Sequence, residues 1–222
     1  MRTTIKETTF WLPEKGSLSP NHVTDDPLRF YYHPVVGKLY VNRINHVLSL
    51  LSPPYERILE VGYGSGILFP TLSKITRSIA GIDIKSPPPD LVENLRKLGV
   101  TSIQDLRTGE LSTCGFGKEE FDLVIAISIF EHIKNPLEML QEIHRILKPN
   151  GSLLVGMPRV DMTMAALFKL IGFPNIGDHH VTTYQQFLKF TEKYFTVSKF
   201  KKLAPFKMSF FPLYFSMLLK KI

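Results

Sequence analysis

Apolar residues gather in five short runs along the middle of the chain, between residues 57 and 157. These runs predict strands at 57–61, 78–83, 101–104, 121–127 and 152–157. Residues 123–127 read Leu-Val-Ile-Ala-Ile, with no polar interruption. A strand that is apolar on both faces is typical of a parallel sheet covered by helices on each side. The pattern therefore predicts a buried, mostly parallel sheet.

Segments with helical spacing separate these strands. Helices are predicted at 66–76, 88–98 and 136–147, the last with apolar residues at Leu137, Leu140 and Ile143 along one face. The alternation of strands and helices predicts an α/β fold, doubly wound, with helices on both faces of the sheet.

Further elements are expected on either side of this core. They are a helix at 36–51, an irregular stretch at 159–180 with a short helical part at 162–171, a helix at 183–194, and a strand at 195–201. The final apolar run, 212–219, is too short to cross a bilayer. We interpret it as the last strand, antiparallel to the others and preceded by a hairpin around 204–209.

The positive charge of the chain is concentrated at its C-terminal end. The net charge is +7, and residues from 189 onward hold eight lysines against one acid, Glu192. A basic end suits a solvated rim, nucleic acid or the surface of an anionic membrane, so peripheral membrane contact stays open. The single cysteine, Cys114, and an N-terminus without an apolar export signal favour a cytoplasmic location.

A glycine-rich turn follows the first predicted strand. Glu60 stands at the end of that strand, and the turn contains Gly62, Tyr63, Gly64 and Gly66. Glycine allows a sharp turn and lets the backbone approach a ligand, while the N–H groups of a following helix suit an anionic group. The spacing differs from the dinucleotide fingerprint, which requires glycine at the position of Ile67. Asp83, at the end of the second strand, is placed to accept hydrogen bonds from ribose hydroxyls.

The motifs together resemble one known family. They are Glu60-x-Gly62-x-Gly64-x-Gly66, Gly81-Ile82-Asp83, Phe121-Asp122-Leu123-Val124, Glu131-His132-Ile133 and Leu147-Lys148-Pro149-x-Gly151. In this order and spacing they are similar to those of class I S-adenosylmethionine (SAM) dependent methyltransferases, above all the small-molecule type. The resemblance is strong over residues 55 to 160 and looser beyond. It implies a seven-stranded sheet with the last strand antiparallel.

The resemblance also implies roles for individual residues. Glu60 would lie near the methionine amino group, and the glycines, with Tyr63, would pass beneath the cofactor. Asp83 would hold the ribose hydroxyls and Ile84 would pack on the adenine ring. Asp105 and Leu106, at the end of the third strand, would bind the adenine edge. Ser128 would lie near the sulfonium.

The acceptor is less clearly indicated. Some acceptors require a general base, for which His132 and His180 are the candidates, although each is as readily a structural histidine. No spacing typical of a zinc site occurs, so no metal is expected. A small-molecule, lipid-linked or glycan acceptor is favoured over nucleic acid, which only the basic end supports. A non-catalytic SAM-binding partner subunit is the alternative from another class. The oligomeric state stays open.

We therefore expect a single domain over residues 1–222. Its parts would be a helical extension (1–55), a cofactor-binding core (56–158), an acceptor lid (159–180) and a C-terminal helix with two strands (181–222).

Overall fold

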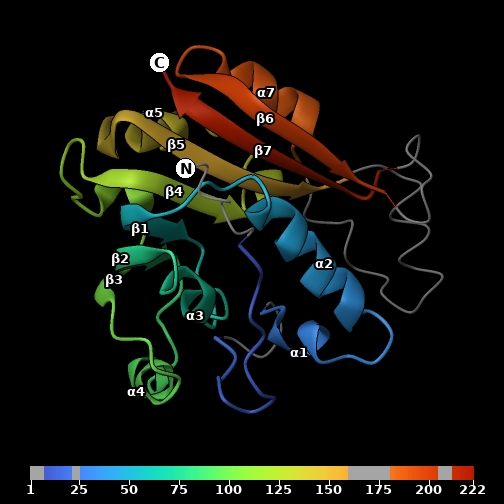
Figure 1. Cartoon of the computed structure of the whole chain (residues 1–222). Coiled ribbons are helices and arrows are strands. Elements are labelled where there is room, and N and C mark those ends of the chain that lie inside the picture. Colours follow the sequence, from blue (N-terminus) through green and yellow to red (C-terminus); the bar gives the residue numbers. More distant parts are fainter. Residues whose placement is uncertain (1–7, 22–25, 160–180, 205–211) are drawn as a thin grey trace, which may run out of the picture.

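A seven-stranded sheet forms the centre of the computed structural model, which describes residues 8–21, 26–159, 181–204 and 212–222 (Figure 1). The strands are β1 (Tyr55–Val61), β2 (Thr76–Asp83), β3 (Ile103–Thr108), β4 (Phe121–Ile127), β5 (Leu147–Pro158), β6 (Phe195–Leu203) and β7 (Tyr214–Lys221). Their order in the sheet is β3-β2-β1-β4-β5-β7-β6. Strand β7 pairs antiparallel with both β5 and β6, and the remaining pairs are parallel. The predicted fold is confirmed.

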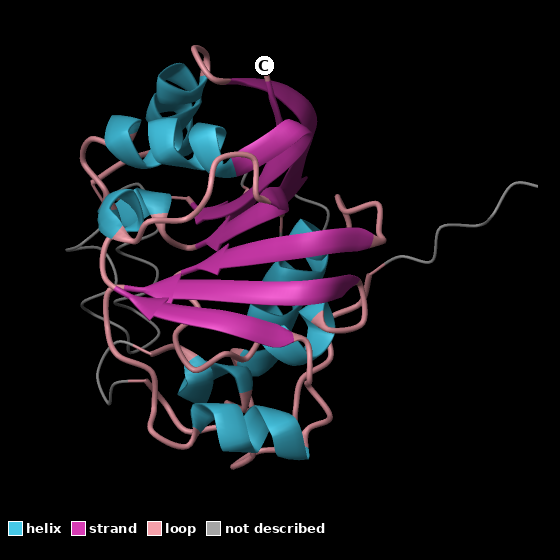
Figure 2. Ribbon diagram, turned by 90° about the vertical axis from the view of Figure 1, so that its left-hand side faces the viewer, coloured by secondary structure: helices cyan, strands magenta, loops and turns pink. Residues whose placement is uncertain are grey.

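Helices cover both faces of the sheet, as Figure 2 shows. They are α1 (Leu28–Tyr31), α2 (Gly37–Leu48), α3 (Phe69–Leu72), α4 (Leu91–Lys97), α5 (Leu137–Ile146) and α7 (Tyr184–Thr191), with short 3₁₀ turns at Leu111–Thr113 and Phe130–His132. Alternate strand residues point to opposite faces. Leu123 and Ile125 of β4 accordingly pack with α2, α3 and α4, whereas Val124 and Ala126 pack with α5 and α7.

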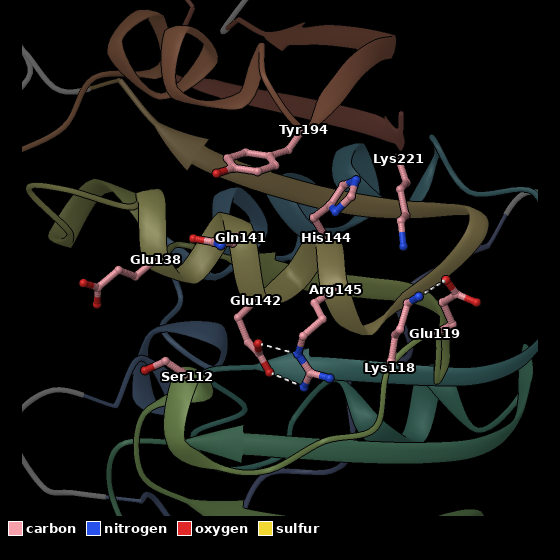
Figure 3. A pocket seen from close by; sticks show the side chains of 10 residues that line it. All are labelled: Ser112, Lys118, Glu119, Glu138, Gln141, Glu142, His144, Arg145, Tyr194 and Lys221. Carbon is pink, nitrogen blue, oxygen red and sulfur yellow. Dashed lines mark hydrogen bonds and ion pairs between the residues drawn. The ribbon is translucent and has the colours of Figure 1, made fainter.

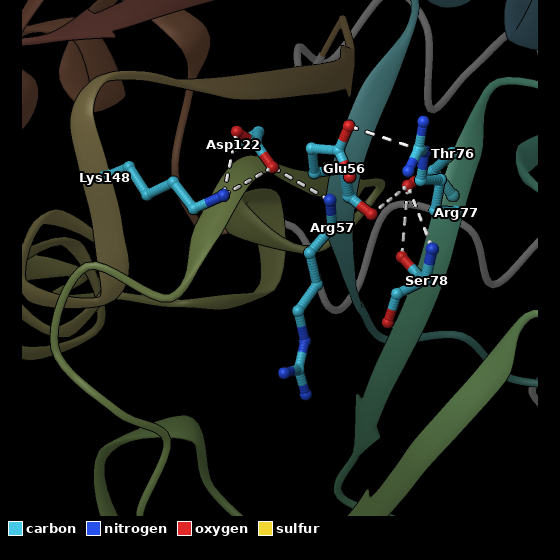
Figure 4. A network of polar contacts seen from close by, with 7 residues as sticks. All are labelled: Glu56, Arg57, Thr76, Arg77, Ser78, Asp122 and Lys148. Atoms are coloured by element: carbon cyan, nitrogen blue, oxygen red, sulfur yellow. Dashed lines mark hydrogen bonds and ion pairs between the residues drawn. The ribbon is translucent and has the colours of Figure 1, made fainter.

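Asp122 ties three strands together at their amino ends (Figure 4). Its carboxylate accepts a hydrogen bond from the backbone N–H of Arg57 at 2.8 Å and pairs with the Lys148 ammonium at 3.0 Å. These contacts join β4 to β1 and to the start of β5. The aspartate of the Phe121-Asp122 motif therefore stabilises the sheet at the edge opposite the carboxyl ends of the parallel strands.

Several boundaries differ from the sequence-based expectation. The helix expected at 66–76 is only the four-residue α3; Gly66 has φ +71° and therefore cannot be the first residue of a right-handed helix. Strand β3 occupies 103–108 instead of 101–104, which places Asp105 and Leu106 inside the strand. The helix expected at 162–171 and most of the hairpin at 204–209 lie outside the described residues.

Several lysines of the basic C-terminal part bind the fold itself. Lys199 donates to the Leu50 carbonyl at 2.9 Å and Lys201 to the Ser49 hydroxyl at 2.8 Å, next to the C-terminal end of α2. Lys220 and Lys221 donate to carbonyl groups near the start of β5. These lysines therefore form hydrogen bonds within the protein as well as contributing to its positive charge. Within the described ranges, no helix has the length and apolar character needed to cross a membrane.

Candidate functional site

A cavity of about 630 Å³ opens at the carboxyl ends of β1, β2 and β4. Ligands of open α/β sheets bind at this edge, near the point where the strand order reverses. The order here reverses between β1 and β4. The cavity wall includes the glycine-rich turn, the end of β2, the segments after β3 and β4, and parts of the N-terminal segment.

The glycine-rich turn adopts a backbone that only glycine takes easily. Gly62, Gly64 and Gly66 all have positive φ angles, of +76°, +52° and +71°. A Cβ on Gly62 would lie 2.1 Å from the Ile129 Cδ1 atom, so the Ile129 side chain would have to move to admit one. A Cβ on Gly64 would lie at an ordinary 3.5 Å from the Asp26 carboxylate. The turn therefore exposes bare backbone to the cavity.

Asp83 is fixed by two backbone hydrogen bonds. One oxygen accepts from the Gly64 N–H and the other from the Lys85 N–H, each at 2.9 Å. A carboxylate oxygen accepts more than one hydrogen bond, so both retain capacity for a ligand. Ile84, the next residue, lines the cavity and is 73% exposed. Asp83 and Ile84 thus offer a polar and an apolar surface side by side.

Glu60 and Tyr63 lie deeper. Glu60 is 7% exposed, and its Oε2 atom has no hydrogen-bond partner among the described residues. Burial raises the pKa of Glu60 well above its usual range, and the nearby Asp83 carboxylate adds to the effect. Burial and the same two carboxylates raise the pKa of Tyr63 to about 12. Tyr63 packs on Phe69 and lines the cavity as well.

Ser128, Glu131 and His132 follow β4. Ser128 has φ +58°, and its hydroxyl lies 3.0 Å from the Tyr214 hydroxyl. Glu131 is 1% exposed, and burial raises its pKa to about 8 although a backbone hydrogen bond, Arg43 and Ser128 oppose the shift. The His132 imidazole lies 4.0 Å from the Glu131 carboxylate with about half of its surface exposed. Ser128 and His132 line the cavity.

Two predicted adenine-binding residues do not reach the described cavity wall. Asp105 pairs with the Arg107 guanidinium at 2.6 Å, and Leu106 packs into the core beside β2. Because β3 extends to Thr108, the residues at its carboxyl end are Gly109, Glu110 and Leu111, and these line the cavity instead. His180, the second candidate base, lies outside the described residues.

The N-terminal segment supplies cavity residues that the sequence motifs did not indicate. Phe10, Asp26, Tyr31 and Arg43 all line the wall. The Arg43 guanidinium stacks on the Tyr40 ring at 4.0 Å, and its Nε atom has no hydrogen-bond partner among the described residues. Arg43 lies one turn before Val47, on the α2 face that packs on the sheet. The sequence offered one sign of this role, because Arg43 is a charged residue on the apolar face of the helix predicted at 36–51.

A second hollow lies on the surface near α5 and the C-terminal end of β7 (Figure 3). Its charged groups interact mainly with one another: Arg145 pairs with Glu142 at 2.7 Å and Lys118 with Glu119 at 3.4 Å. Such internal pairing leaves little charge for a ligand. Across the described ranges, no three His, Cys, Asp or Glu side chains gather closely enough to hold a metal ion.

Comparison with known proteins agrees with this geometry. A family model described as a methyltransferase domain matches residues 38–189. The chain is 28% identical over 153 residues to a ubiquinone biosynthesis O-methyltransferase of Haemophilus ducreyi, and the match covers 66% of this chain and 58% of that protein. A protein of the same name from Actinobacillus pleuropneumoniae is 28% identical over 170 residues, 73% of this chain and 64% of that one. The chain therefore spans about three fifths of these relatives.

Solved structures show the same fold at low sequence identity. The N-methyltransferase NodS from Bradyrhizobium japonicum, in complex with S-adenosyl-L-homocysteine, matches with a TM-score of 0.62 and 16% identity, covering 90% of this chain and 93% of that one. A SAM-dependent methyltransferase from Aquifex aeolicus matches with a TM-score of 0.58 and 18% identity, covering 75% and 82%.

Proposed function

The chain belongs to the SAM-dependent methyltransferase family, and from this premise we propose that it transfers a methyl group from SAM to a small-molecule acceptor, at an oxygen atom. The observation that carries the proposal is the arrangement of one cavity wall. There the Gly64 N–H of the glycine-rich turn donates a hydrogen bond to Asp83, and the Glu60 Oε2 atom has no hydrogen-bond partner among the described residues. The O-methyltransferase names of the two relatives favour oxygen as the acceptor atom.

The cavity offers groups that fit each part of SAM. Asp83 would accept hydrogen bonds from the ribose hydroxyls. Glu60 would pair with the α-ammonium group and Arg43 with the carboxylate of the methionine part. Ile84 would pack on the adenine ring, whose edge would meet residues 109–111 in place of Asp105 and Leu106. Ser128 would lie near the sulfonium.

Bound SAM supplies a methyl group that is already activated for transfer. The protein would then hold the acceptor oxygen in line with that methyl and exclude water, which accounts for much of a rate enhancement of this kind. A hydroxyl acceptor must also lose its proton. His132 lines the cavity and would take that proton, with the Glu131 carboxyl group close behind the imidazole.

Two measurements test the function. Isothermal calorimetry should show SAM binding with one site per chain. Radiolabelled SAM with fractionated cell extract should then label a small-molecule or lipid fraction, and His132→Ala should reduce that labelling while SAM binding is kept. Labelling confined to nucleic acid would refute the proposed acceptor class. SAM binding without transfer to any fraction would support the alternative of a non-catalytic partner subunit.

The location of the protein is a separate matter. We propose that it works in the cytoplasm and meets membranes only peripherally, through the lysines of its C-terminal part. Lys202 is exposed on the edge strand β6, which supports such contact with anionic lipid. Sedimentation with vesicles containing phosphatidylserine, compared with neutral vesicles, tests the contact. Equal recovery with both kinds of vesicle would refute it.

A further inference from the structure

In the protein without ligand, the Glu60 carboxyl group is buried and no described ion pair compensates its charge. Its carboxyl group is 7% exposed at the end of β1, and Oε2 has no hydrogen-bond partner among the described residues. None of the ion pairs in the described part of the chain involves Glu60. Burial without a partner strongly disfavours the ionised form of a carboxyl group.

The surroundings make this charge less favourable still. Asp83 approaches from the neighbouring strand β2, where Gly81 lies directly opposite Glu60. Tyr63, from the glycine-rich turn, is the other titratable group that interacts with it. The cavity also contains Asp26 from the N-terminal segment, Arg43 from α2 and, farther along its wall, Lys85 and His132. Two carboxylates at close range disfavour ionisation of the more buried one.

We propose that Glu60 holds a proton in the free protein and releases it when the α-ammonium group of the cofactor binds. The inference rests on the function proposed above. On binding, the O–H bond of the Glu60 carboxylic acid breaks, its proton passes to the solvent, and the resulting carboxylate pairs with the ammonium group. The raised pKa of Glu60 in the free protein agrees with this order of events.

A consequence follows for affinity. Because binding releases a proton, the affinity for SAM increases with pH, up to tenfold per pH unit while Glu60 is protonated in the free protein. The increase ends once Glu60 ionises in the free protein, or once the α-amino group of the cofactor begins to lose its own proton near pH 8. Only ligands with an ammonium group would therefore release the Glu60 proton on binding, and only their affinity would depend on pH in this way.

Calorimetry in two buffers tests the proposal without an acceptor. Binding is measured at pH 6.5 in phosphate and in imidazole, whose different ionisation enthalpies reveal the number of protons released. SAM and S-adenosylhomocysteine, which both carry the α-ammonium group, should each release close to one proton. Methylthioadenosine, which lacks the amino-acid part, should bind more weakly and release none.

Two variants complete the experiment. Glu60→Gln resembles the protonated acid, so it should bind SAM at least tenfold more weakly and without proton release. Glu56→Gln is the matched control, because Glu56 lies exposed at the other end of β1 and pairs with Arg77. The Glu56→Gln variant should bind SAM with the affinity of the unmodified protein and release the same number of protons.

The outcomes separate this inference from the proposed function. SAM binding with no proton release, or equal release with methylthioadenosine, overturns the role of Glu60 and leaves the methyltransferase function intact. No binding of SAM at any pH overturns both. The comparison of ligands on the unmodified protein decides the matter even where Glu60→Gln does not fold.

Discussion

At the scale of single residues, Asp83 has two tasks, which a comparison of Asp83→Ala with Asp83→Asn separates. Asp83→Ala removes the ribose acceptor and also frees the Gly64 N–H. Hydrogen bonds to a charged group contribute about 2 kcal/mol, so SAM affinity should fall by roughly 30-fold or more. Calorimetry measures the affinity, and thermal unfolding checks the fold.

Asp83→Asn serves as the control for Asp83→Ala. The amide oxygen can still accept the Gly64 N–H hydrogen bond, but it carries no charge for the ribose hydroxyls. This variant should therefore have an intermediate affinity. An Asp83→Ala protein that is folded and binds SAM normally would refute the ribose assignment.

Gly62 and Gly64 form a natural pair for a second residue-scale prediction. Both have positive φ, which costs a residue with a Cβ about 1 kcal/mol. Only Gly62 adds a steric clash, with Ile129 after β4. Gly62→Ala should therefore lower the free energy of unfolding by more than Gly64→Ala does.

Urea unfolding of both glycine variants, side by side, makes this comparison. Equal losses of stability would show that the Ile129 contact relaxes without cost. Gly64→Val, whose branched side chain would extend from the turn toward Asp26, should in addition abolish SAM binding.

The residues that line the site could be predicted from the sequence wherever a motif placed them at the end of a strand. Glu60, Asp83 and Ser128 reach the cavity as expected, because β1, β2 and β4 end where the apolar runs end. Asp105 does not, because β3 is only partly buried and its apolar run gives no clear end. Arg43 carries no motif, and only its position on α2 reveals it.

At the scale of elements, the strands were more predictable than the helices. Continuous apolar runs mark β4 and the second half of β5, whereas α3 shrinks to four residues between two turns. A helix boundary depends on backbone angles such as φ +71° at Gly66, which a sequence pattern does not reveal. The amphipathic stripe of α5 was long enough to predict that helix within a residue.

Asp122 gives an element-scale prediction. It joins β4 to β1 and β5 at the edge of the sheet opposite the cavity. Asp122→Ala should lower the free energy of unfolding by about 1–2 kcal/mol, since its pairs are partly exposed and a backbone N–H loses its acceptor. SAM affinity should stay within twofold.

Urea unfolding and calorimetry measure the two effects of Asp122→Ala. Glu93→Gln is the control, because its pair with Lys97 lies in solvent and its loss should not change stability measurably. A large loss of SAM affinity in Asp122→Ala would show that the two edges of the sheet are coupled.

At the scale of the whole molecule, one apolar sheet between two helical layers creates the site. The two clusters on its faces hold β1 and β4 adjacent while their connections leave in opposite directions. The cavity forms where those connections separate, and the N-terminal segment closes part of it with Phe10, Asp26 and Arg43. Local patterns predicted the sheet, but this long-range packing of residues 8–21 and 26–44 has no local signal in the sequence.

The two buried acids make the stability of the whole molecule depend on pH. Burial raises the pKa of both Glu60 and Glu131, the latter from 4.5 to about 8. Between pH 4.5 and about 8 the folded protein keeps the Glu131 proton that the unfolded chain has already lost, and Glu60 acts in the same direction. The free energy of unfolding contributed by each acid is therefore greatest below pH 4.5 and falls as pH rises, by up to about 1.4 kcal/mol per pH unit.

Glu131→Gln isolates this effect, because the amide resembles the protonated acid and cannot ionise. The variant and the unmodified protein should have similar free energies of unfolding at pH 5, and the variant should become the more stable one as the pH approaches 8. The difference between the two curves cancels histidines such as His46, whose lowered pKa acts in the opposite direction. Urea unfolding at four pH values gives the curves. Parallel curves would mean that Glu131 is ionised throughout, and that the nearby Arg43 compensates its charge fully.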